Sequence, residues 1–251
     1  MLPILRLGEL ALPTYPLLLL VAYWLGMTLA ASRAKQLNFD SDHIYNAGLY
    51  GLIAGILGAR IWFVLSHWEN YAPDITQAFS LSRSALSAGE GLIIAALVVL
   101  IYLQRNKVPL GDFVDAATPG IALALIIGNV GALLGGIALG AATALPWAID
   151  VSGTSRHPIQ FYEVGGLLIF LIFLYSKRQL RPWAGFQFWL FVAVYGLIRL
   201  FFEAFRARPW LVGNGYLAIQ LLALAAIIVA LAVMAYKFRE DTPQADVIQS
   251  E

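Results

Sequence analysis

The sequence predicts an all-α, polytopic membrane protein, and three observations support this prediction. Hydrophobic residues make up 60% of the 251 residues and charged residues only 12%, whereas soluble domains carry about 25% charged residues. Apolar runs that approach the roughly 20 residues of a spanning helix recur along the whole chain. Basic residues follow alternate runs, as they do when every second loop faces the cytoplasm. We therefore expect seven transmembrane helices in one integral membrane domain, residues 1–251.

Seven apolar runs define the expected helices. They cover residues 13–31, 45–66, 91–104, 113–138, 160–176, 184–204 and 213–236. The third run is short unless residues 87–90 extend it. The first nine residues lack the basic region and the small-residue cleavage site of a signal peptide, so we expect the first run to remain as a span.

The lysines set the predicted orientation. Lys35, Lys107, Lys177 and Lys237 lie just after the first, third, fifth and seventh runs. By the positive-inside rule these loops are cytoplasmic. The amino terminus is then outside, the carboxy terminus is cytoplasmic, and the main outer loops cover about 67–90 and 139–159.

Several classes of chemistry are excluded by composition. The chain has no cysteine, which rules out a disulfide, a thiolate metal site and a cysteine nucleophile within it. We find no zinc-type histidine spacing, Gly-rich phosphate loop or nucleophile elbow. The net charge is +1, and the charged residues are divided between loops on the two sides of the membrane. They therefore form no basic patch of the kind that binds nucleic acid. We therefore predict no metal, no cofactor and no nucleic-acid partner.

Charged residues interrupt the sixth run. If this segment is helical, Tyr195, Arg199, Glu203 and Arg206 fall at i, i+4, i+8 and i+11 and form one polar stripe. An arginine at mid-bilayer costs about 2.5–3.5 kcal/mol, so it requires an ionic partner, water or a bound anion. A further arginine, Arg60, lies in the second run. Either these arginines bind an anionic ligand, or they are anchors to lipid headgroups.

A second polar segment opens the fifth run. Arg156, His157, Gln160, Tyr162 and Glu163 are five hydrogen-bonding side chains within eight residues. His157 has the reference pKa of a general acid or base, although it could equally orient a neighbour. Glu163 is placed to offset the charge of an intramembrane arginine. Together with Tyr15, at the outer start of the first run, these segments are expected to line one cavity that opens outward.

The fourth run is rich in glycine. Gly131 and Gly135 are four residues apart, as are Gly136 and Gly140. Small residues at this spacing let helices approach closely. We favour helix packing over approach of the backbone to a ligand.

Three motifs resemble those of the bacterial prolipoprotein diacylglyceryl transferases. They are G-x-R-x-x-[YF]-V-L at Gly58 to Leu65, R-H-P-x-Q-x-Y-E at Arg156 to Glu163, and Y-G-x-x-R-x-x-x-E-x-x-R at Tyr195 to Arg206. The resemblance covers nearly the full chain. It implies transfer of a diacylglyceryl group from phosphatidylglycerol to the cysteine thiol of a lipoprotein precursor, at the outer face of the bacterial plasma (inner) membrane.

The resemblance also implies roles for individual residues. Arg199 holds the lipid phosphate and stabilises the departing glycerol phosphate, Glu203 and Arg206 orient it, and Tyr15 lines the pocket. The expected catalytic residues are Arg199, Glu203, His157 and Tyr15, and the expected lipid-binding residues are Arg60, Arg156, Gln160, Tyr162, Glu163, Tyr195 and Arg206.

The chain departs from the family pattern at several positions. In the block G-R-x-G-N-F-x-N-G-E-x-x-G, the arginine is replaced by Asn129, the first asparagine by Ala132 and the glutamate by Ile137. The family's H-G-G-L appears here as Gly89-Glu90-Gly91-Leu92, without histidine. His157 or Glu90 would then have to take over proton transfer.

Three functions follow as alternatives. The first is the transferase activity, with phosphatidylglycerol and lipobox-containing precursors as partners. The second is a non-catalytic relative, an accessory subunit that binds lipid or lipoprotein in a membrane complex. The third is a transporter of an anionic solute, although the sequence shows no inverted repeat or paired broken helices.

Overall fold

The computed structural model describes residues 2–8, 10–76, 87–151, 153–213 and 215–240. The chain forms two compact units, whose boundaries fall inside two of the long helices. The first unit comprises residues 1–33 and 114–251, and the second comprises residues 34–113. The prediction of a single domain over 1–251 is not tested by this division and stays a prediction.

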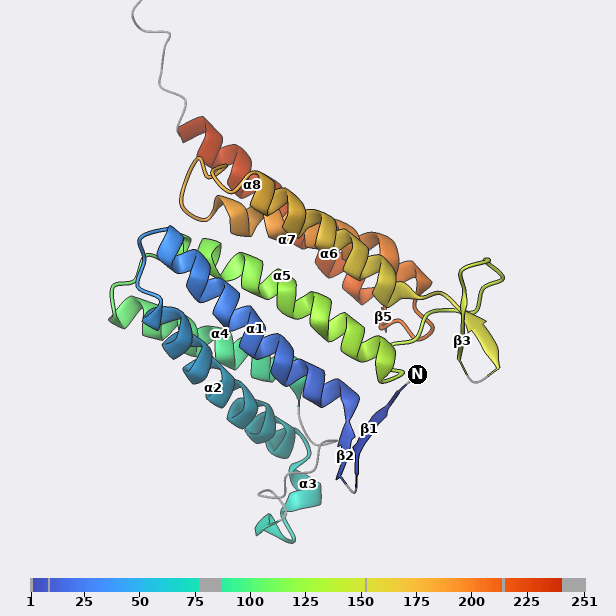
Figure 1. Ribbon diagram of the computed structural model, residues 1–251. Coiled ribbons are helices and arrows are strands. Elements are labelled where there is room, and N and C mark those ends of the chain that lie inside the picture. Colours follow the sequence, from blue (N-terminus) through green and yellow to red (C-terminus); the bar gives the residue numbers. More distant parts are fainter. Residues whose placement is uncertain (1, 9, 77–86, 152, 214, 241–251) are drawn as a thin grey trace, which may run out of the picture. The chain divides into compact units, whose positions relative to one another are not determined.

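Five long helices build the first unit: α1 (Thr14–Gln36), α5 (Leu110–Leu134), α6 (Ile159–Ser176), α7 (Phe186–Phe202) and α8 (Ala218–Glu240). Each forms over a nearly continuous apolar stretch that offers a helix no competing turn signal. Helix α6 packs on α7, and α7 packs on α8 (Figure 1). The core between α5, α6 and α7 consists of Ala122, Ile126, Leu167, Phe170, Leu174, Phe191 and Ile198.

Glycines bring α1 and α5 into close contact. A Cβ atom on Gly120 would lie 2.2 Å from the carbonyl oxygen of Gly26, so the two backbones touch where neither residue has a side chain. Further along α5, a Cβ atom on Gly131 would lie 3.0 Å from Leu18 Cβ, and one on Gly135, just past the end of the helix, would lie 3.1 Å from Tyr15 Cβ. The predicted packing role is confirmed for Gly131, whereas Gly136 and Gly140 lie beyond the end of α5, and Gly140 contacts the backbone of His157 instead of a helix.

A buried carboxylate fixes the start of α7. Asp115 of α5 is fully buried, and its Oδ2 accepts hydrogen bonds from Arg181 Nε at 2.7 Å and from the Gly185 N–H at 2.8 Å. Its Oδ1 accepts from the Phe188 N–H at 3.0 Å. A carboxylate at the positive end of a helix satisfies amides that lack an intrahelical partner. The interaction therefore ties α7 to α5.

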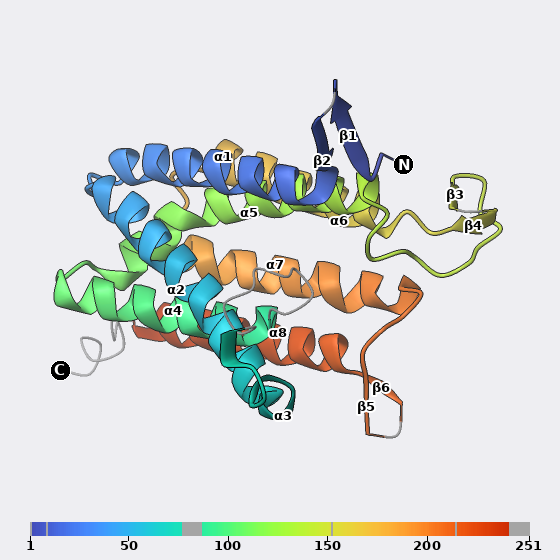
Figure 2. The ribbon, with the colours of Figure 1, turned by 90° about the horizontal axis from the view of Figure 1, so that it is seen from below.

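The second unit is built on α2 (Asp42–Ser66) and α4 (Ala88–Arg105), with the short α3 (Trp68–Tyr71) after α2. Helices α2 and α4 lie side by side (Figures 1 and 2). Glycines again permit the contact, since a Cβ atom on Gly91 would lie 2.6 Å from both Ala59 Cβ and the Gly55 carbonyl oxygen. The predicted outer loop 67–90 extends into residues 77–86, which lie outside the described residues.

Among the residues described, six helices are long and apolar enough to cross a membrane: α1, α2, α5, α6, α7 with its following turn, and α8. This is the pattern of a multi-pass membrane protein. Helix α4 forms where the third span was expected but is not one of the six. The seventh span and the orientation of the termini stay predictions.

Three short hairpins gather at one end of the first unit (Figures 1 and 2). They are β1 (Ile4–Leu7) with β2 (Leu10–Pro13), β3 (Ile149–Val151) with β4 (Thr154–Arg156), and β5 (Leu211–Val212) with β6 (Tyr216–Leu217). The loop after α5 also pairs with the segment after α7, through bridges Gly140 to Arg206 and Ala142 to Arg156. Backbone pairing thus positions the arginines of these loops.

Candidate functional site

The polar stripe of the sixth run is not carried by one helix, which corrects the expectation of a continuous α-helix through Arg206. Helix α7 ends at Phe202, a 3-10 turn covers Glu203–Phe205, and Arg206 has an extended backbone, with φ −79° and ψ 142°. The amide of Arg206 still donates to the Glu203 carbonyl oxygen at 3.2 Å. The tighter turn brings Arg206 back toward Glu203 instead of continuing the rise of the helix.

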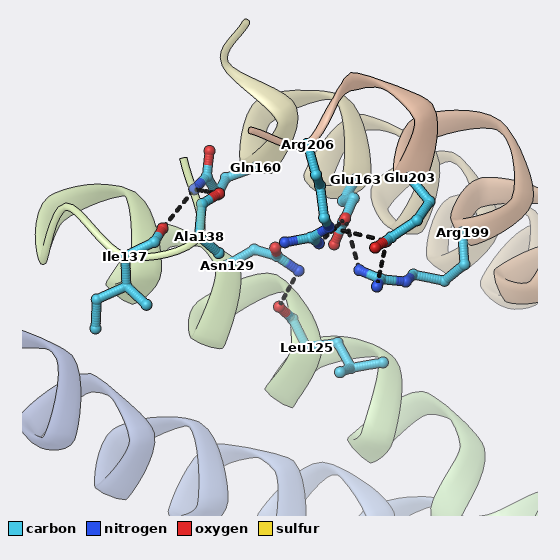
Figure 3. Close-up of polar contacts among 9 residues, drawn as sticks. All are labelled: Leu125, Asn129, Ile137, Ala138, Gln160, Glu163, Arg199, Glu203 and Arg206. Carbon is cyan, nitrogen blue, oxygen red and sulfur yellow. Dashed lines mark hydrogen bonds and ion pairs between the residues drawn. The ribbon is translucent and has the colours of Figure 1, made fainter. Parts of the chain in front are cut away.

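Four charged side chains form a closed quartet, which we define as Glu163, Arg199, Glu203 and Arg206 (Figure 3). Glu163 Oε1 accepts from Arg199 NH1 at 2.9 Å and from Arg206 NH2 at 2.7 Å. Glu203 Oε2 accepts from Arg199 NH2 at 2.6 Å and from Arg206 Nε at 2.9 Å. Each carboxylate therefore bridges both guanidinium groups, and the prediction that Glu163 offsets Arg199 or Arg206 is confirmed for both.

The quartet is largely buried, so its ion pairs are strong but each charge must have a partner. The carboxylate side chains are 3% exposed and the arginines 16–18% exposed. In such surroundings an unpaired charge is costly, and in the alternating arrangement each charged group contacts two groups of opposite charge. The quartet is neutral as a whole. Each guanidinium carries five N–H donors and spends two of them on the carboxylates, so donors remain for a ligand.

The quartet borders a cavity of about 510 Å³, which we call the apolar-walled cavity. Glu163, Arg199 and Arg206 line it together with Tyr15 and Tyr195. Its remaining wall comes mainly from apolar residues of α1 and α5: Leu19, Ala22, Ile121, Ala124, Leu125, Gly128 and Ala132. A cavity with guanidinium groups at one side and hydrocarbon elsewhere suits an amphipathic anion.

Three of the positions that depart from the family pattern line this same cavity. Asn129, Ala132 and Ile137 are all among its lining residues. Asn129 donates from Nδ2 to the Leu125 carbonyl oxygen at 3.0 Å, within its own helix (Figure 3). The wall that faces the quartet thus carries a neutral amide and two apolar side chains.

A second cavity, of about 500 Å³, lies against the loops that follow α5 and α7, and we call it the arginine-lined cavity. Arg156, Arg206 and Arg208 line it, with Gly136, Ala138, Leu139 and Ala207. Arg206 and Ala138 belong to the linings of both cavities. The Ala207 N–H donates to the Leu139 carbonyl oxygen at 3.0 Å, which holds the two loops together beside Arg206.

Three predicted site residues bind other parts of the protein. Buried Gln160 donates from Nε2 to the carbonyl oxygens of Ile137 and Ala138, at 2.8 and 3.0 Å, and so holds the loop after α5 (Figure 3). Tyr162 Oη accepts from Trp147 Nε1 at 2.7 Å and lies 3.5 Å from His157 Nδ1. None of the three is among the described lining residues of either cavity. Their proposed roles in lipid binding and catalysis stay predictions.

Arg60 belongs to the second unit. Its guanidinium carbon lies 5.5 Å from the ring centre of Tyr71, within range of a cation–π interaction. Glu90, the other residue considered for proton transfer, lies in the first turn of α4. Their participation in a common site with Arg199 stays a prediction.

Sequence reasoning missed two residues of the site. Arg208, which belongs to none of the three motifs, lines the arginine-lined cavity. Trp147, which also lies outside the motifs, donates from its indole N–H to Tyr162. The spacing of Arg208 from Arg206 was the only available signal, and a loop has no periodicity from which to infer a shared cavity.

Comparison with known proteins identifies the family of this chain. A family model described as prolipoprotein diacylglyceryl transferase matches residues 3–236. The chain belongs to the prolipoprotein diacylglyceryl transferase family. The match takes in the quartet, both cavities and all seven long helices.

Relatives of similar length carry the transferase name. A protein named phosphatidylglycerol–prolipoprotein diacylglyceryl transferase from Finegoldia magna is 28% identical over 92% of this chain and 93% of its own length. A protein of that name from Clostridioides difficile is 29% identical over 85% of this chain and 86% of its own length. One from Thermus thermophilus is 29% identical, covering 91% and 95%. The chain is thus similar to these proteins over most of their length, at modest identity.

Proposed function

We propose that this protein transfers a diacylglyceryl group from phosphatidylglycerol to the cysteine thiol of a lipoprotein precursor, at the outer face of the bacterial inner membrane. Family membership supports the reaction class. The observation that carries the proposal is the quartet at the edge of the apolar-walled cavity. It places guanidinium groups where a phosphate would sit and hydrocarbon where a diacylglyceryl group would sit.

The proposed reaction is a displacement at the glyceryl carbon that bears the phosphate ester. The substrate sulfur forms a bond to this carbon, the carbon–oxygen bond breaks, and glycerol phosphate leaves with the electron pair. The thiol proton passes to a base, for which His157 is our candidate. Arg199 and Arg206 stabilise the charge that develops on the departing phosphate, because fixed N–H donors act on it without reorganisation.

The quartet's carboxylates have a positioning role in this proposal. Glu163 and Glu203 hold the two guanidinium groups at fixed places through the four hydrogen bonds. Such fixed donors need no reordering when the ligand arrives. Tyr15 and Tyr195 line the same cavity and would contact the glyceryl part of the lipid.

A second candidate function is an accessory protein that binds phosphatidylglycerol or lipoprotein without catalysis. The observation in its favour is that Asn129, Ala132 and Ile137, which replace three polar family residues, all line the apolar-walled cavity. The loss of those polar family residues leaves fewer polar groups around the reacting atoms.

A transfer assay separates the two functions. Purified protein in phosphatidylglycerol vesicles is incubated with a lipobox peptide, and the peptide is examined by mass spectrometry. We expect a diacylglyceryl adduct on the cysteine. Arg199→Gln should reduce its rate by about 10²-fold or more, the typical effect of removing one donor to a developing anion.

Arg239→Gln is the matched control, because it removes an exposed arginine in the last turn of α8. It should leave the rate unchanged. Absence of adduct, together with phosphatidylglycerol binding that Arg199→Gln abolishes, would reject the transferase and establish the binder.

A further inference from the structure

The arginine-lined cavity has the charge of an anion site. Three guanidinium groups line it, and no acidic side chain is among its described lining residues. Only Arg206 is paired with carboxylates, through its ion pairs with Glu163 and Glu203. Arg156 and Arg208 make no ion pair with the described acidic residues and leave the cavity positively charged.

Arg156 and Arg208 also have unused donors. Arg156 NH1 donates to the Gly140 carbonyl oxygen at 3.1 Å, while its Nε is buried and has no hydrogen-bond partner among the described residues. A buried donor without a partner is uncommon because its desolvation is not offset. Arg208 is exposed, and none of the described residues accepts a hydrogen bond from it. The donors available to a ligand are therefore the side chain of Arg208 and the terminal N–H groups of Arg156 that are not bonded to Gly140, while the inaccessible Nε of Arg156 does not face the cavity.

Arg206 and Ala138 connect this cavity with the site of the proposed reaction, since both residues line the two cavities. We infer that the arginine-lined cavity receives the departing glycerol phosphate, while the diacylglyceryl group stays in the apolar-walled cavity. This inference rests on the proposed function. The ligand class is a phosphate monoester of a small polyol, for which a cavity of about 500 Å³ lined by three arginines is sufficient.

Charge balance explains why this chain needs such a cavity. The quartet is neutral, so a phosphate that gains a negative charge on leaving finds no net positive charge there. Asn129 supplies only a neutral amide where the family pattern has an arginine, and that amide is already bonded to Leu125. Arg156 and Arg208 provide the missing positive charge on the other side of Arg206.

A binding experiment tests the inference without requiring turnover. The protein is placed in nanodiscs of phosphatidylcholine alone, and equilibrium dialysis measures binding of radiolabelled glycerol phosphate, inorganic phosphate and uncharged glycerol. We expect saturable binding of one glycerol phosphate, weaker binding of phosphate and none of glycerol. Arg208→Gln and Arg156→Gln should each weaken glycerol phosphate binding at least about tenfold, because each removes a charge-assisted hydrogen bond.

Arg6→Gln is the control variant, since it removes an exposed arginine of β1 in the same unit that lines neither cavity. It should bind glycerol phosphate as the natural protein does. Absence of saturable binding, or equal weakening by Arg6→Gln, overturns the inference. If the transfer assay gives adduct but glycerol phosphate does not bind, this inference fails while the proposed function stands.

Intact phosphatidylglycerol carries the same glycerol phosphate group and is the alternative ligand for this cavity. Native mass spectrometry of protein released from nanodiscs that contain phosphatidylglycerol measures how much lipid is retained. We expect Arg208→Gln to weaken glycerol phosphate binding more than lipid retention. An equal loss of both would assign the cavity to the lipid headgroup and overturn its assignment to the product.

Discussion

In this protein, each of two buried carboxylates binds the same two arginines. Oε1 of Glu163 binds both Arg199 and Arg206, and Oε2 of Glu203 binds the same two residues. With one-to-one pairing each guanidinium would contact a single carboxylate, whereas here each contacts both. Sharing lets two carboxylates hold two arginines from both sides, so that the loss of either carboxylate affects the whole quartet.

Glu163→Gln is expected to destabilise the protein strongly. It keeps the side-chain size but removes one negative charge and leaves the buried quartet with a net charge of +1. Breaking a buried ion pair by removing one partner costs about 3–5 kcal/mol. The thermal unfolding midpoint in detergent should therefore fall clearly, and light scattering on heating or a dye-based thermal shift would measure it.

Two further variants make this prediction specific. Glu240→Gln makes the same chemical change in the ion pair with Lys237, in which both side chains are about half exposed. It should change the thermal unfolding midpoint little. Glu163→Gln combined with Arg206→Gln restores neutrality and should recover part of the loss. If the double variant unfolds as early as the single one, charge balance is not what the quartet supplies.

At the scale of elements, the position of α1 against α5 sets the width of the apolar-walled cavity. Tyr15, Leu19 and Tyr23 of α1 form one wall and Leu125 and Asn129 of α5 form part of the other. Gly26 and Gly120 allow the two helices to touch near this cavity. A side chain at the contact would move one wall relative to the other.

Gly120→Ala tests this link between helix packing and the site. The added Cβ atom would lie 2.2 Å from the Gly26 carbonyl oxygen, so the helices must separate. Overpacking of this kind costs about 1–3 kcal/mol. We expect a lower unfolding midpoint and weaker retention of phosphatidylglycerol in nanodiscs.

Gly165→Ala in α6 is the matched control, because its Cβ atom would meet no atom within 4 Å. It should leave lipid retention intact and raise stability by about 0.5–1 kcal/mol, the helix-interior difference between glycine and alanine. Normal lipid retention in Gly120→Ala would show that the α1–α5 contact does not control the cavity.

At the scale of the whole molecule, the number of crossings determines where the termini lie. Seven spans place the two termini on opposite sides of the membrane, whereas six place them on the same side. The six helices that meet the length and composition for crossing do not include α4. The lysine pattern, by contrast, requires α4 to cross, because Lys107 follows it directly.

Single cysteines resolve this question, since the chain has none of its own. Arg6→Cys and Arg239→Cys carry the label near the two ends, both at exposed positions. With seven spans, a membrane-impermeant maleimide should label the cysteine at 6 on intact spheroplasts and the one at 239 only after permeabilisation. Labelling of both cysteines on intact spheroplasts, or of neither, would establish an even number of crossings.

The sequence alone determined the membrane-protein class, the places of the long helices and the polar residues that matter. Apolar run length and charge are local properties, and a helix in lipid must satisfy its own backbone within the same segment. Six predicted spans therefore coincide with helices long and apolar enough to cross, and the third coincides with α4. The same logic identified Glu163 as a partner of the intramembrane arginines.

Only the tertiary structure decided how those residues are used. The 3-10 turn after Phe202 brings Arg206 into the quartet, and the pairing of the loops after α5 and α7 makes Arg208 part of a cavity. It also placed Gln160 on the loop backbone and Asn129, Ala132 and Ile137 on one cavity wall. These contacts join segments far apart in the chain through irregular backbone, whose course depends on packing and not on any repeating pattern in the sequence.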